Sequence, residues 1–204
     1  MINKDLSIEN STLGYYHDKA TEYTESTLYV DFSEIQEWFT SFLEKGNLIL
    51  DFGCGAGRDS LSFLNMGYKV EAMDGSTRLC AIAEKVTNLK VKNVRFSELN
   101  EKDKYDGIWA CASIVHVSLK EINNILNKMH SALKKEGVVY CSFKYGKFEG
   151  IKNGRYYTYF TEEKFNKLIT NINLFNIVET RITSDVRKER NQEKWLNVIL
   201  KKLN

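Results

Sequence analysis

The sequence contains no proline and only three histidines in 204 residues. The histidines, His17, His116 and His130, are scattered and form no His-x-x-x-His pair, so the sequence predicts no metal site of that spacing. The four cysteines also stand alone, without the paired spacing of zinc or redox motifs, which favours reduced thiols in a cytosol. Because no run of about 18 apolar residues is present, no membrane-spanning segment is predicted.

An excess of charge of one sign is missing as well. The chain carries 29 basic and 27 acidic side chains, a net charge of +2, and the two kinds are interspersed. Nothing therefore favours a nucleic acid over a neutral small molecule as partner. The first five residues lack the apolar core of a signal peptide. We expect a cytoplasmic protein without a membrane partner, either a monomer or a homodimer.

The length of the chain suits one domain. With 204 residues, of which 43% are hydrophobic, it can bury a substantial core, and no linker or repeat interrupts it. Segments with strand and helix patterns alternate along most of the sequence. We therefore predict a single α/β domain over residues 1–204, built on a mostly parallel sheet.

The strongest local pattern lies at residues 47–60. An apolar run at 48–52 is followed by three alternating glycines and an amphipathic segment, which predicts a buried strand, a tight turn and a helix. Gly53, Gly55 and Gly57 suit a loop pressed against a bound molecule, because glycine takes positive φ at no steric cost. Such a loop at the carboxyl end of a strand is where open α/β sheets bind nucleotides.

Spacing narrows the choice of nucleotide. A dinucleotide fingerprint needs a third glycine three places after the second, where this chain has Arg58, so a pyrophosphate site is disfavoured. The absence of a following Gly-Lys-Ser/Thr excludes the phosphate-binding loop of NTPases. What remains is acid-x-Gly-x-Gly-x-Gly, with Asp51 at the tip of the strand, where it can meet a positively charged amine. This motif resembles the first motif of the S-adenosylmethionine (SAM) dependent methyltransferases with a Rossmann-like fold.

A second acid supports an adenosine-type ligand. Residues 68–73 predict a second strand, which ends in Asp74-Gly75-Ser76, with Ser76 placed to cap the next helix. An acid in this place, roughly 20 residues past the glycines, can accept hydrogen bonds from both ribose hydroxyls. The alternative is that Asp74 serves only the turn and the helix cap.

The resemblance to the methyltransferases covers nearly the whole chain, from Tyr15 to Leu203. It implies an α/β, Rossmann-like three-layer sandwich with a seven-stranded, mostly parallel sheet and an antiparallel last strand. Within the family, the chain looks most like the compact tellurite-resistance-type and small-molecule methyltransferases. The cofactor implied is SAM, with S-adenosylhomocysteine as its product. The predicted strands are 48–52, 68–73, 93–96, 104–112, 138–144, 177–182 and 194–200.

Helix signals lie between these strands. Ser33 begins a capping box before a helix with aromatic residues on its inner face. Ser118 and Thr161 are predicted to cap two later helices, and Gly137 to take the left-handed position that ends the first of them.

Further cofactor contacts are implied by the family resemblance. After the third strand an acid accepts from the adenine amino group, and the next residue's amide meets a ring nitrogen; Glu98 and Leu99 occupy these positions, with Glu in place of the more usual Asp. Small residues after the fourth strand let the chain pass beside the methionyl arm. The cofactor site implied is therefore Tyr15, Tyr23, Asp51, Gly53, Cys54, Gly55, Asp74, Gly75, Ser76, Glu98, Leu99, Cys111 and Ala112.

Two segments are expected to cover the ligands. Residues 1–32 begin with a polar, aperiodic stretch to about residue 13, and Tyr15, Tyr16 and Tyr23 follow. This is similar to the lid that many small-molecule methyltransferases fold over the cofactor, which excludes water from the sulfonium. The alternative is a surface helix with aromatic residues on its inner side.

The second segment is the Gly- and Tyr-rich stretch 145–160, which is long for a connection. In this fold it lies over the acceptor pocket, and the alternative is a β-hairpin that serves packing alone. It offers Tyr145, Arg155 and Tyr157 as acceptor residues, and Arg155 implies an anionic group on the substrate. His116 follows the fourth strand, and an imidazole with a pKa of about 6.5 can accept a proton there. Otherwise His116 only shapes the pocket wall.

We therefore expect an enzyme that moves a methyl group from SAM to a small-molecule acceptor by in-line displacement, without a metal. Such a displacement chiefly requires that nucleophile and methyl be held in line. Two alternatives stay open. One is an RNA- or protein-modifying methyltransferase, and the other is a SAM-binding regulatory protein without turnover.

Overall fold

A computed structural model describes the chain from Lys4 to Leu203, apart from the side chains of residues 4–8 and 188. Its centre is a seven-stranded sheet with the order β3-β2-β1-β4-β5-β9-β8. Only β9 runs antiparallel, to β5 and to β8. This confirms the predicted Rossmann-like sheet. Its strands are β1 (Leu48–Phe52), β2 (Lys69–Asp74), β3 (Val91–Asn93), β4 (Tyr105–Ala110), β5 (Leu133–Lys144), β8 (Phe175–Ser184) and β9 (Lys194–Lys202).

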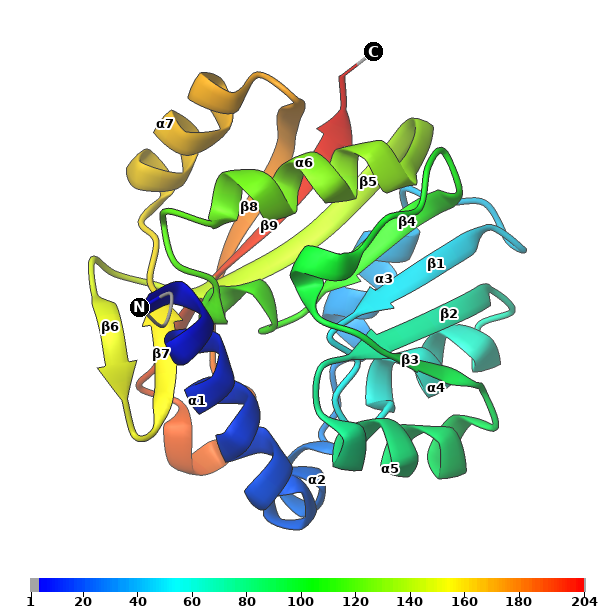
Figure 1. The fold of residues 1–204 in the computed structure, drawn as a ribbon. Coiled ribbons are helices and arrows are strands. Elements are labelled where there is room, and N and C mark those ends of the chain that lie inside the picture. The colour runs from blue at the N-terminus through cyan, green and yellow to red at the C-terminus, as the bar shows by residue number, and fades with distance from the viewer. Residues whose placement is uncertain (1–3, 204) are drawn as a thin grey trace.

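Helices cover both faces of the sheet (Figure 1). In β1 and β4, neighbouring residues alternate between the two faces. Ile49 packs in the layer that contains α3 and α4, whereas Leu50 packs in the layer that contains α6 and α7. Burial on both faces explains why these strands have nearly continuous apolar sequences. The bounds of the helices are α3 (Ser33–Thr40), α4 (Arg58–Asn65), α5 (Thr77–Thr87), α6 (Ile122–Ala132) and α7 (Glu162–Ile172).

A cover made from distant parts of the chain lies over the edge at which the parallel strands end. It consists of α1 (Lys4–Asp18), α2 (Ala20–Thr27) and the hairpin of β6 (Glu149–Lys152) and β7 (Arg155–Thr158). Figure 1 shows α1 along this edge, in contact with β7 on one side and α5 on the other. The backbone N–H of Tyr156 donates to Thr12 Oγ1 at 3.0 Å. Helix α1 and the hairpin thus form one surface.

The N-terminal segment is more regular than its sequence predicts. Residues 9–13, taken as aperiodic, belong to α1, whereas residues 1–3 of the predicted lid lie outside the described residues. Contacts with the hairpin compensate for the weak amphipathic pattern, as tertiary packing does for many helices. None of the helices within 4–203 is long and apolar enough to cross a membrane.

The third strand ends earlier than predicted. Strand β3 stops at Asn93, and Phe96–Glu98 forms a short 3₁₀ turn, so no α-helix connects β3 to β4 in this described part of the chain. The cause is local, because the Glu98 carboxylate accepts from the Arg95 N–H at 2.6 Å and closes the turn. The strict alternation of strand and helix is therefore interrupted once.

Two predicted helix ends are also corrected. Helix α6 ends at Ala132, and the residue with left-handed φ near this end is Glu136, at 65°, rather than Gly137. Helix α3 begins at Ser33, whose N–H donates to Asp31 Oδ1 at 2.9 Å, so Asp31 supplies the acceptor that a serine cap would have offered.

Two other caps are confirmed. Ser76 accepts from the Leu79 N–H at 3.4 Å and Thr161 from the Lys164 N–H at 3.2 Å. The predicted Ser118 cap is wrong, because the N-cap of α6 is Glu121, whose N–H donates to Ser118 Oγ at 3.3 Å in the turn before the helix.

Candidate active site

The glycine-rich loop after β1 has the backbone that its sequence predicts. Gly53, Gly55 and Gly57 have φ values of 88°, 55° and 88°, in the left-handed region that glycine enters without a Cβ penalty. The Gly53 N–H donates to the Met73 carbonyl at 2.9 Å, which ties the loop to the end of β2. A Cβ added to Gly53 would lie 2.5 Å from the Cβ of Ser113. The loop is therefore fixed close to the end of β4.

The carboxylate of Asp74 holds the same loop from the next strand. Its Oδ2 accepts from the Gly55 N–H at 3.0 Å, and its Oδ1 accepts from the Ser76 N–H at 2.8 Å. Burial raises the pKa of Asp74 to about 6, against the lowering effect of these two amide bonds. Each oxygen keeps a further lone pair, so the geometry leaves room for the predicted bonds from two ribose hydroxyls.

A cavity of about 350 Å³ lies between this loop, α1 and the start of α6. We call it the first cavity. Its charged lining consists of Glu9, Asp74, Glu121 and Arg95, and Arg95 forms an ion pair with Glu9 at 3.0 Å. The excess of acids favours a cationic ligand. Of the predicted cofactor residues it is lined by Tyr23, Gly53, Gly55, Asp74, Gly75, Cys111 and Ala112.

The first cavity has features that SAM requires. Ser113 lines it, is 6% exposed, and has no hydrogen-bond partner for Oγ within the described residues. A buried hydroxyl without a partner is unfavourable unless a ligand supplies one. Asp74 would hold the ribose, Ser113 would bond a polar group of the cofactor, and the acidic lining suits a sulfonium. The residues present therefore fit this cofactor.

The two residues predicted to contact adenine lie outside the first cavity. Glu98 and Leu99 do not line it, whereas Phe96 and Ser97 do. Glu98 turns back to the Arg95 N–H, and Leu99, which is 5% exposed, packs in the core. The third strand ends three residues earlier than predicted, and the short turn after it changes which side chains face the cavity.

Asp51 is not at the cavity surface. It is 2% exposed, lines neither cavity described here, and accepts from Ser60 Oγ at 2.6 Å. Burial, together with nearby Asp59, raises the pKa of Asp51 to about 8.

Three other predicted cofactor residues occupy different places. Tyr15 packs against the hairpin, with the Arg155 guanidinium 4.4 Å from its ring centroid, and Tyr16 lines the cavity instead. Ser76 acts through its N–H on Asp74 and as the cap of α5. Cys54 lines a second cavity, described next, rather than the first.

The second cavity has a volume of about 120 Å³ and adjoins the first. The two share a wall, made of Tyr16, Tyr23, Gly53, Cys111, Ala112 and His116. Ala112 lies two residues after the end of β4 and has a φ of 49°, which is uncommon for a residue with a Cβ, and its N–H donates to Ser142 Oγ at 2.8 Å. Unusual backbone held in this way is frequent at functional sites.

His116 is fixed in one tautomer within the shared wall. Its Nδ1 lies 2.6 Å from the Tyr156 carbonyl, which can only accept, so Nδ1 carries the ring proton. Nε2 therefore accepts from the Tyr16 hydroxyl at 2.8 Å. Burial lowers the pKa of His116 to about 4, with smaller contributions from Arg155 and Lys144. The imidazole is neutral at pH 7.

The hairpin supplies two of its three predicted acceptor residues. Arg155 and Tyr157 line the second cavity. The Arg155 guanidinium lies 4.4, 5.6 and 5.2 Å from the ring centroids of Tyr15, Tyr16 and Tyr157. Tyr145 is 38% exposed and does not line the cavity, because its backbone pairs with β9 through Lys194 and leaves the side chain outside.

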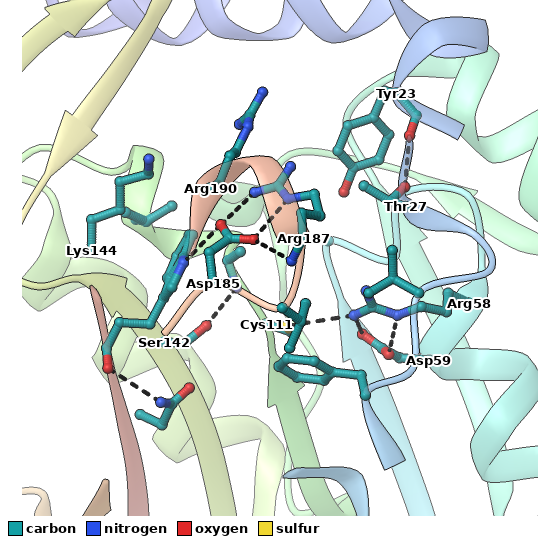
Figure 2. A pocket seen from close by; sticks show the side chains of 18 of the residues that line it. Tyr23, Thr27, Arg58, Asp59, Cys111, Ser142, Lys144, Asp185, Arg187 and Arg190 are labelled. Carbon is teal, nitrogen blue, oxygen red and sulfur yellow. Dashed lines mark hydrogen bonds and ion pairs between the residues drawn. The ribbon is translucent and has the colours of Figure 1, made fainter. Parts of the chain in front are cut away.

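The connection between β8 and β9 also contributes to the site, although its sequence was not predicted to do so. Asp185, Arg187 and Arg190 from this connection line the second cavity beside Lys144 at the end of β5 (Figure 2). Because β8 is parallel to β5, its carboxyl end lies at the same edge of the sheet as the glycine loop. A charged Asp-x-Arg segment directly after this strand was therefore the available signal.

Arg58 stands where a dinucleotide fingerprint would have its third glycine, and it also lines the second cavity. It makes a two-bond ion pair with Asp59, at 2.8 and 2.9 Å. Asp59 accepts further bonds from Trp109 Nε1 at 2.8 Å and Gln36 Nε2 at 2.6 Å. The start of α4 is thus anchored to both α3 and β4.

The chain matches known methyltransferases. Residues 49–137 match the family model described as a methyltransferase domain. An uncharacterized methyltransferase of Staphylococcus carnosus is 27% identical over 183 residues, which cover 85% of this chain and 87% of that protein. The ribosomal protein L11 methyltransferase of Campylobacter concisus is 26% identical over 114 residues, which cover 53% of this chain and 39% of that protein.

Solved structures share the fold at lower identity. The 1,6-didemethyltoxoflavin-N1-methyltransferase of Burkholderia thailandensis is 22% identical, with a TM-score of 0.75 over 94% of this chain and 85% of that one. The magnesium protoporphyrin IX methyltransferase of Synechocystis is 18% identical, with a TM-score of 0.69 over 94% of this chain and 97% of that one. Residues 49–137 thus resemble a methyltransferase domain, and the chain has the Rossmann-like fold of the class I SAM-dependent methyltransferases.

Proposed function

We propose that the protein transfers a methyl group from SAM to a small-molecule acceptor held in the second cavity. The observation that carries this proposal is the shared wall, in which Tyr16, Ala112 and His116 line both cavities where these meet near the end of β4. A methyl donor in the first cavity and a nucleophile in the second would face each other there. Direct transfer depends mainly on such alignment, which can contribute roughly 7 to 11 kcal/mol.

Different residues of the chain would bind the cofactor in the first cavity and the acceptor in the second. Bound SAM supplies a methyl group on a sulfonium, whose thioether is already a good leaving group. Asp74 and Ser113 would orient the cofactor, and α1 would exclude water from it, because Thr12 and Leu13 of this helix line the first cavity. Residues of β7 and of the β8–β9 connection would orient the acceptor.

The size and cover of the second cavity support a small acceptor. The cavity measures about 120 Å³, below the roughly 300–1,000 Å³ usual for sites of drug-sized ligands. Helix α1 and the hairpin contribute to its walls through Tyr16, Arg155 and Tyr157. The Burkholderia enzyme was crystallised with 1,6-didemethyltoxoflavin, a small molecule, which supports the same interpretation.

A macromolecular acceptor is the second candidate function. One relative is a methyltransferase of ribosomal protein L11. One structural neighbour is the methyltransferase partner of the activator Trm112 from Haloferax volcanii. It is 13% identical, with a TM-score of 0.73 over 94% of this chain and 97% of that one. An RNA or protein acceptor would have to reach the shared wall past α1 and the hairpin.

Within this proposal His116 is the candidate general base. Its neutral ring presents an unprotonated Nε2 to the Tyr16 hydroxyl, so a proton that leaves the acceptor would reach Nε2 by way of that hydroxyl. The depressed pKa of about 4 makes the ring a weak base. The alternative role is to hold Tyr16 in the shared wall.

Two measurements test the function. Calorimetry should show that SAM and S-adenosylhomocysteine bind, while NAD does not. Asp74→Ala should weaken binding by about 1.5–3 kcal/mol for each charged hydrogen bond lost. Asp103→Ala is the matched control, since Asp103 lies away from both cavities and pairs with Lys202.

Transfer is then followed with methyl-labelled SAM and three acceptor pools: a cell metabolite fraction, total RNA and ribosomal protein. The proposal expects label in the small-molecule fraction. Label only in RNA or protein would favour the macromolecular alternative, and binding without any transfer would indicate a regulatory protein.

A further inference from the structure

We propose that the acceptor is a small aromatic anion, whose negative group is bound by Arg155 and Arg190 in the second cavity. This inference rests on the proposed function, because it concerns the acceptor of the same reaction. Four features support it: the pairing of the cations in the cavity, the opposite charge of the two cavities that follows from it, the setting of the Arg155 guanidinium, and the aromatic lining.

The cations of the second cavity are not all neutralised. Five cationic side chains line it, and three of them form ion pairs, namely Arg58–Asp59, Lys144–Glu193 and Arg187–Asp185. Arg155 and Arg190 have no carboxylate partner among the residues that the structure describes. Because an arginine remains charged at every pH of interest, these two groups leave the cavity with uncompensated positive charge.

The two cavities therefore differ in sign. Acids exceed bases around the first cavity, where only Arg95 opposes Glu9, Asp74 and Glu121. Bases exceed acids around the second, and His116 adds no charge because its ring is neutral. A cationic cofactor and an anionic acceptor would each enter the cavity of opposite charge. A cationic acceptor would meet repulsion in the second cavity.

Arg155 is oriented before any ligand arrives. Tyr15, Tyr16 and Tyr157 surround its guanidinium, and Nη1 donates to the Tyr16 hydroxyl at 3.3 Å. Its Nε is buried and has no hydrogen-bond partner in the described chain. A planar guanidinium held in this way, with a donor still unsatisfied, is suited to a carboxylate or phosphate oxygen.

Arg190 comes from a different part of the chain, the connection between β8 and β9. In the same connection Arg187 makes two bonds to Asp185, at 2.8 and 2.6 Å, and Trp195 Nε1 donates to that carboxylate at 3.1 Å. The bonds between Arg187 and Asp185 can be followed in Figure 2. Arg187 is the N-cap of the 3₁₀ turn Lys188–Arg190, and the Arg190 N–H donates to the Arg187 carbonyl at 2.9 Å, so the backbone of Arg190 is anchored while its guanidinium stays available.

The remaining lining favours a planar ligand. Aromatic rings from five separate segments line the second cavity, and they belong to Tyr16, Tyr23, Phe32, Tyr157 and Trp195. Aromatic rings pack well against flat ligands in stacked or edge-to-face arrangements. Together with the small volume, this indicates an acceptor of about one ring with an anionic substituent.

The test uses the full-length protein saturated with S-adenosylhomocysteine and three probes: benzoate, benzamide and phenyl phosphate. Ligand-detected NMR titration gives the affinity of each probe. Benzoate should bind at least about tenfold more tightly than its neutral amide, the effect of one charge-assisted hydrogen bond. The ratio of benzoate to phenyl phosphate then tells whether the site prefers a carboxylate or a phosphate.

Variants locate the effect. Arg155→Gln and Arg190→Gln should each weaken benzoate binding about tenfold and leave benzamide within about twofold. Arg181→Gln is the matched control, because Arg181 lies on β8, pairs with Glu179 at 3.0 Å, and does not line the cavity. It should change neither affinity. If the Arg155→Gln protein does not fold, the benzoate and benzamide affinities of Arg190→Gln alone test the inference.

Equal affinity for benzoate and benzamide, or binding of neither, would overturn the inference, as would an Arg190→Gln protein with unchanged benzoate affinity. These failures are separable from failure of the proposed function. The latter would appear as no S-adenosylhomocysteine binding, or as cofactor binding without methyl transfer to any small molecule.

Discussion

The hydroxyl of Tyr16 lies 2.8 Å from Nε2 of His116, a residue 100 positions later in the chain. The same hydroxyl accepts from Arg155 Nη1 at 3.3 Å, and the Tyr16 ring meets that of Tyr23 edge-on at 5.2 Å. One side chain of α1 therefore joins the end of β4, the hairpin and α2 where the two cavities meet. Helix α1 is thus part of the site and not only a cover over it.

The affinity for S-adenosylhomocysteine should fall at acidic pH because of Asp74. Its pKa is about 6 without ligand, and ribose hydroxyls that donate to the carboxylate would lower it further. Below pH 6 binding must therefore release a proton, so affinity falls as pH falls, by up to about tenfold per pH unit. Above pH 6 this group contributes no pH dependence. Calorimetry from about pH 5 to pH 8 measures the effect.

Asp74→Asn is the control for that titration. It should bind S-adenosylhomocysteine weakly and with little change over the same pH range, since the titrating group is gone. Asp51 also has a raised pKa, at about 8, but its titration would act above neutral pH. If the affinity of Asp74→Asn for S-adenosylhomocysteine still fell below pH 6 as steeply as that of the wild type, the assignment of Asp74 to the ribose would be contradicted.

Gly55→Val should abolish cofactor binding. Gly55 has φ at 55°, and a Cβ there would lie 3.1 Å from the Tyr23 ring, while a β-branched side chain is restricted further. Gly14→Ala is the control, because Gly14 lies in α1 with nothing within 4 Å of an added Cβ. That change should leave binding intact and stabilise the fold by roughly 0.5–1 kcal/mol. Calorimetry and thermal unfolding report the two effects, and retained binding by Gly55→Val would mean that the loop does not touch the cofactor.

The parts of the site that the sequence predicts well are those that depend only on residues close together in the sequence. The glycine loop and Asp74 are adjacent to strands with strong apolar patterns, and a positive φ or a strand-ending acid is a local property. Glu98 lies outside the first cavity because the third strand ends earlier than predicted and a short turn changes which side chains face the cavity. Local pattern gives element type more securely than element ends.

The parts that sequence missed depend on contacts between distant segments. Arg187 and Arg190 enter the second cavity because β9 inserts between β5 and β8, which leaves β8 parallel to β5. The Asp-x-Arg segment after β8 signals charge there, but the strand order that brings it to the cavity is not a local property of the sequence. Likewise, Tyr16 rather than Tyr15 lines the cavities because the packing of α1 on the hairpin fixes the rotation of that helix.

Cofactor binding should protect the N-terminal segment from proteolysis. Helix α1 lines the first cavity through Glu9, Thr12 and Leu13, so a ligand there would add contacts to it and lower its opening rate. Limited proteolysis should cut before Ser33 more slowly when S-adenosylhomocysteine is present. Tyr16→Phe, which removes the bond to His116, should be cut faster than wild type without ligand. Equal cleavage rates with and without S-adenosylhomocysteine would mean that the segment is an ordinary structural element and not a lid over the cofactor.

The His116→Ala variant tests whether His116, in the wall shared by the two cavities, acts as a general base. If the ring is the base, turnover should fall by roughly 10²-fold or more, while affinity for S-adenosylhomocysteine stays within about twofold, because His116 holds no group of the cofactor in this proposal. Tyr16→Phe should lower turnover as well, since it removes the hydroxyl through which a proton would reach Nε2. His130→Ala is the control, because His130 contacts the Leu203 carbonyl at 3.0 Å, away from both cavities.

The pH profile separates a base from a positioning residue. The neutral imidazole is the active form of a base, and its folded-state pKa is about 4, so wild-type turnover should be flat near neutral pH and decline only as pH approaches that value. His116→Gln can still accept a hydrogen bond from Tyr16 but cannot take up a proton. Recovery of turnover in His116→Gln over His116→Ala would therefore assign the ring to positioning Tyr16. If His116→Ala itself turns over normally from about pH 6 to pH 9, the base role is gone and the enzyme works by alignment of the reacting atoms alone.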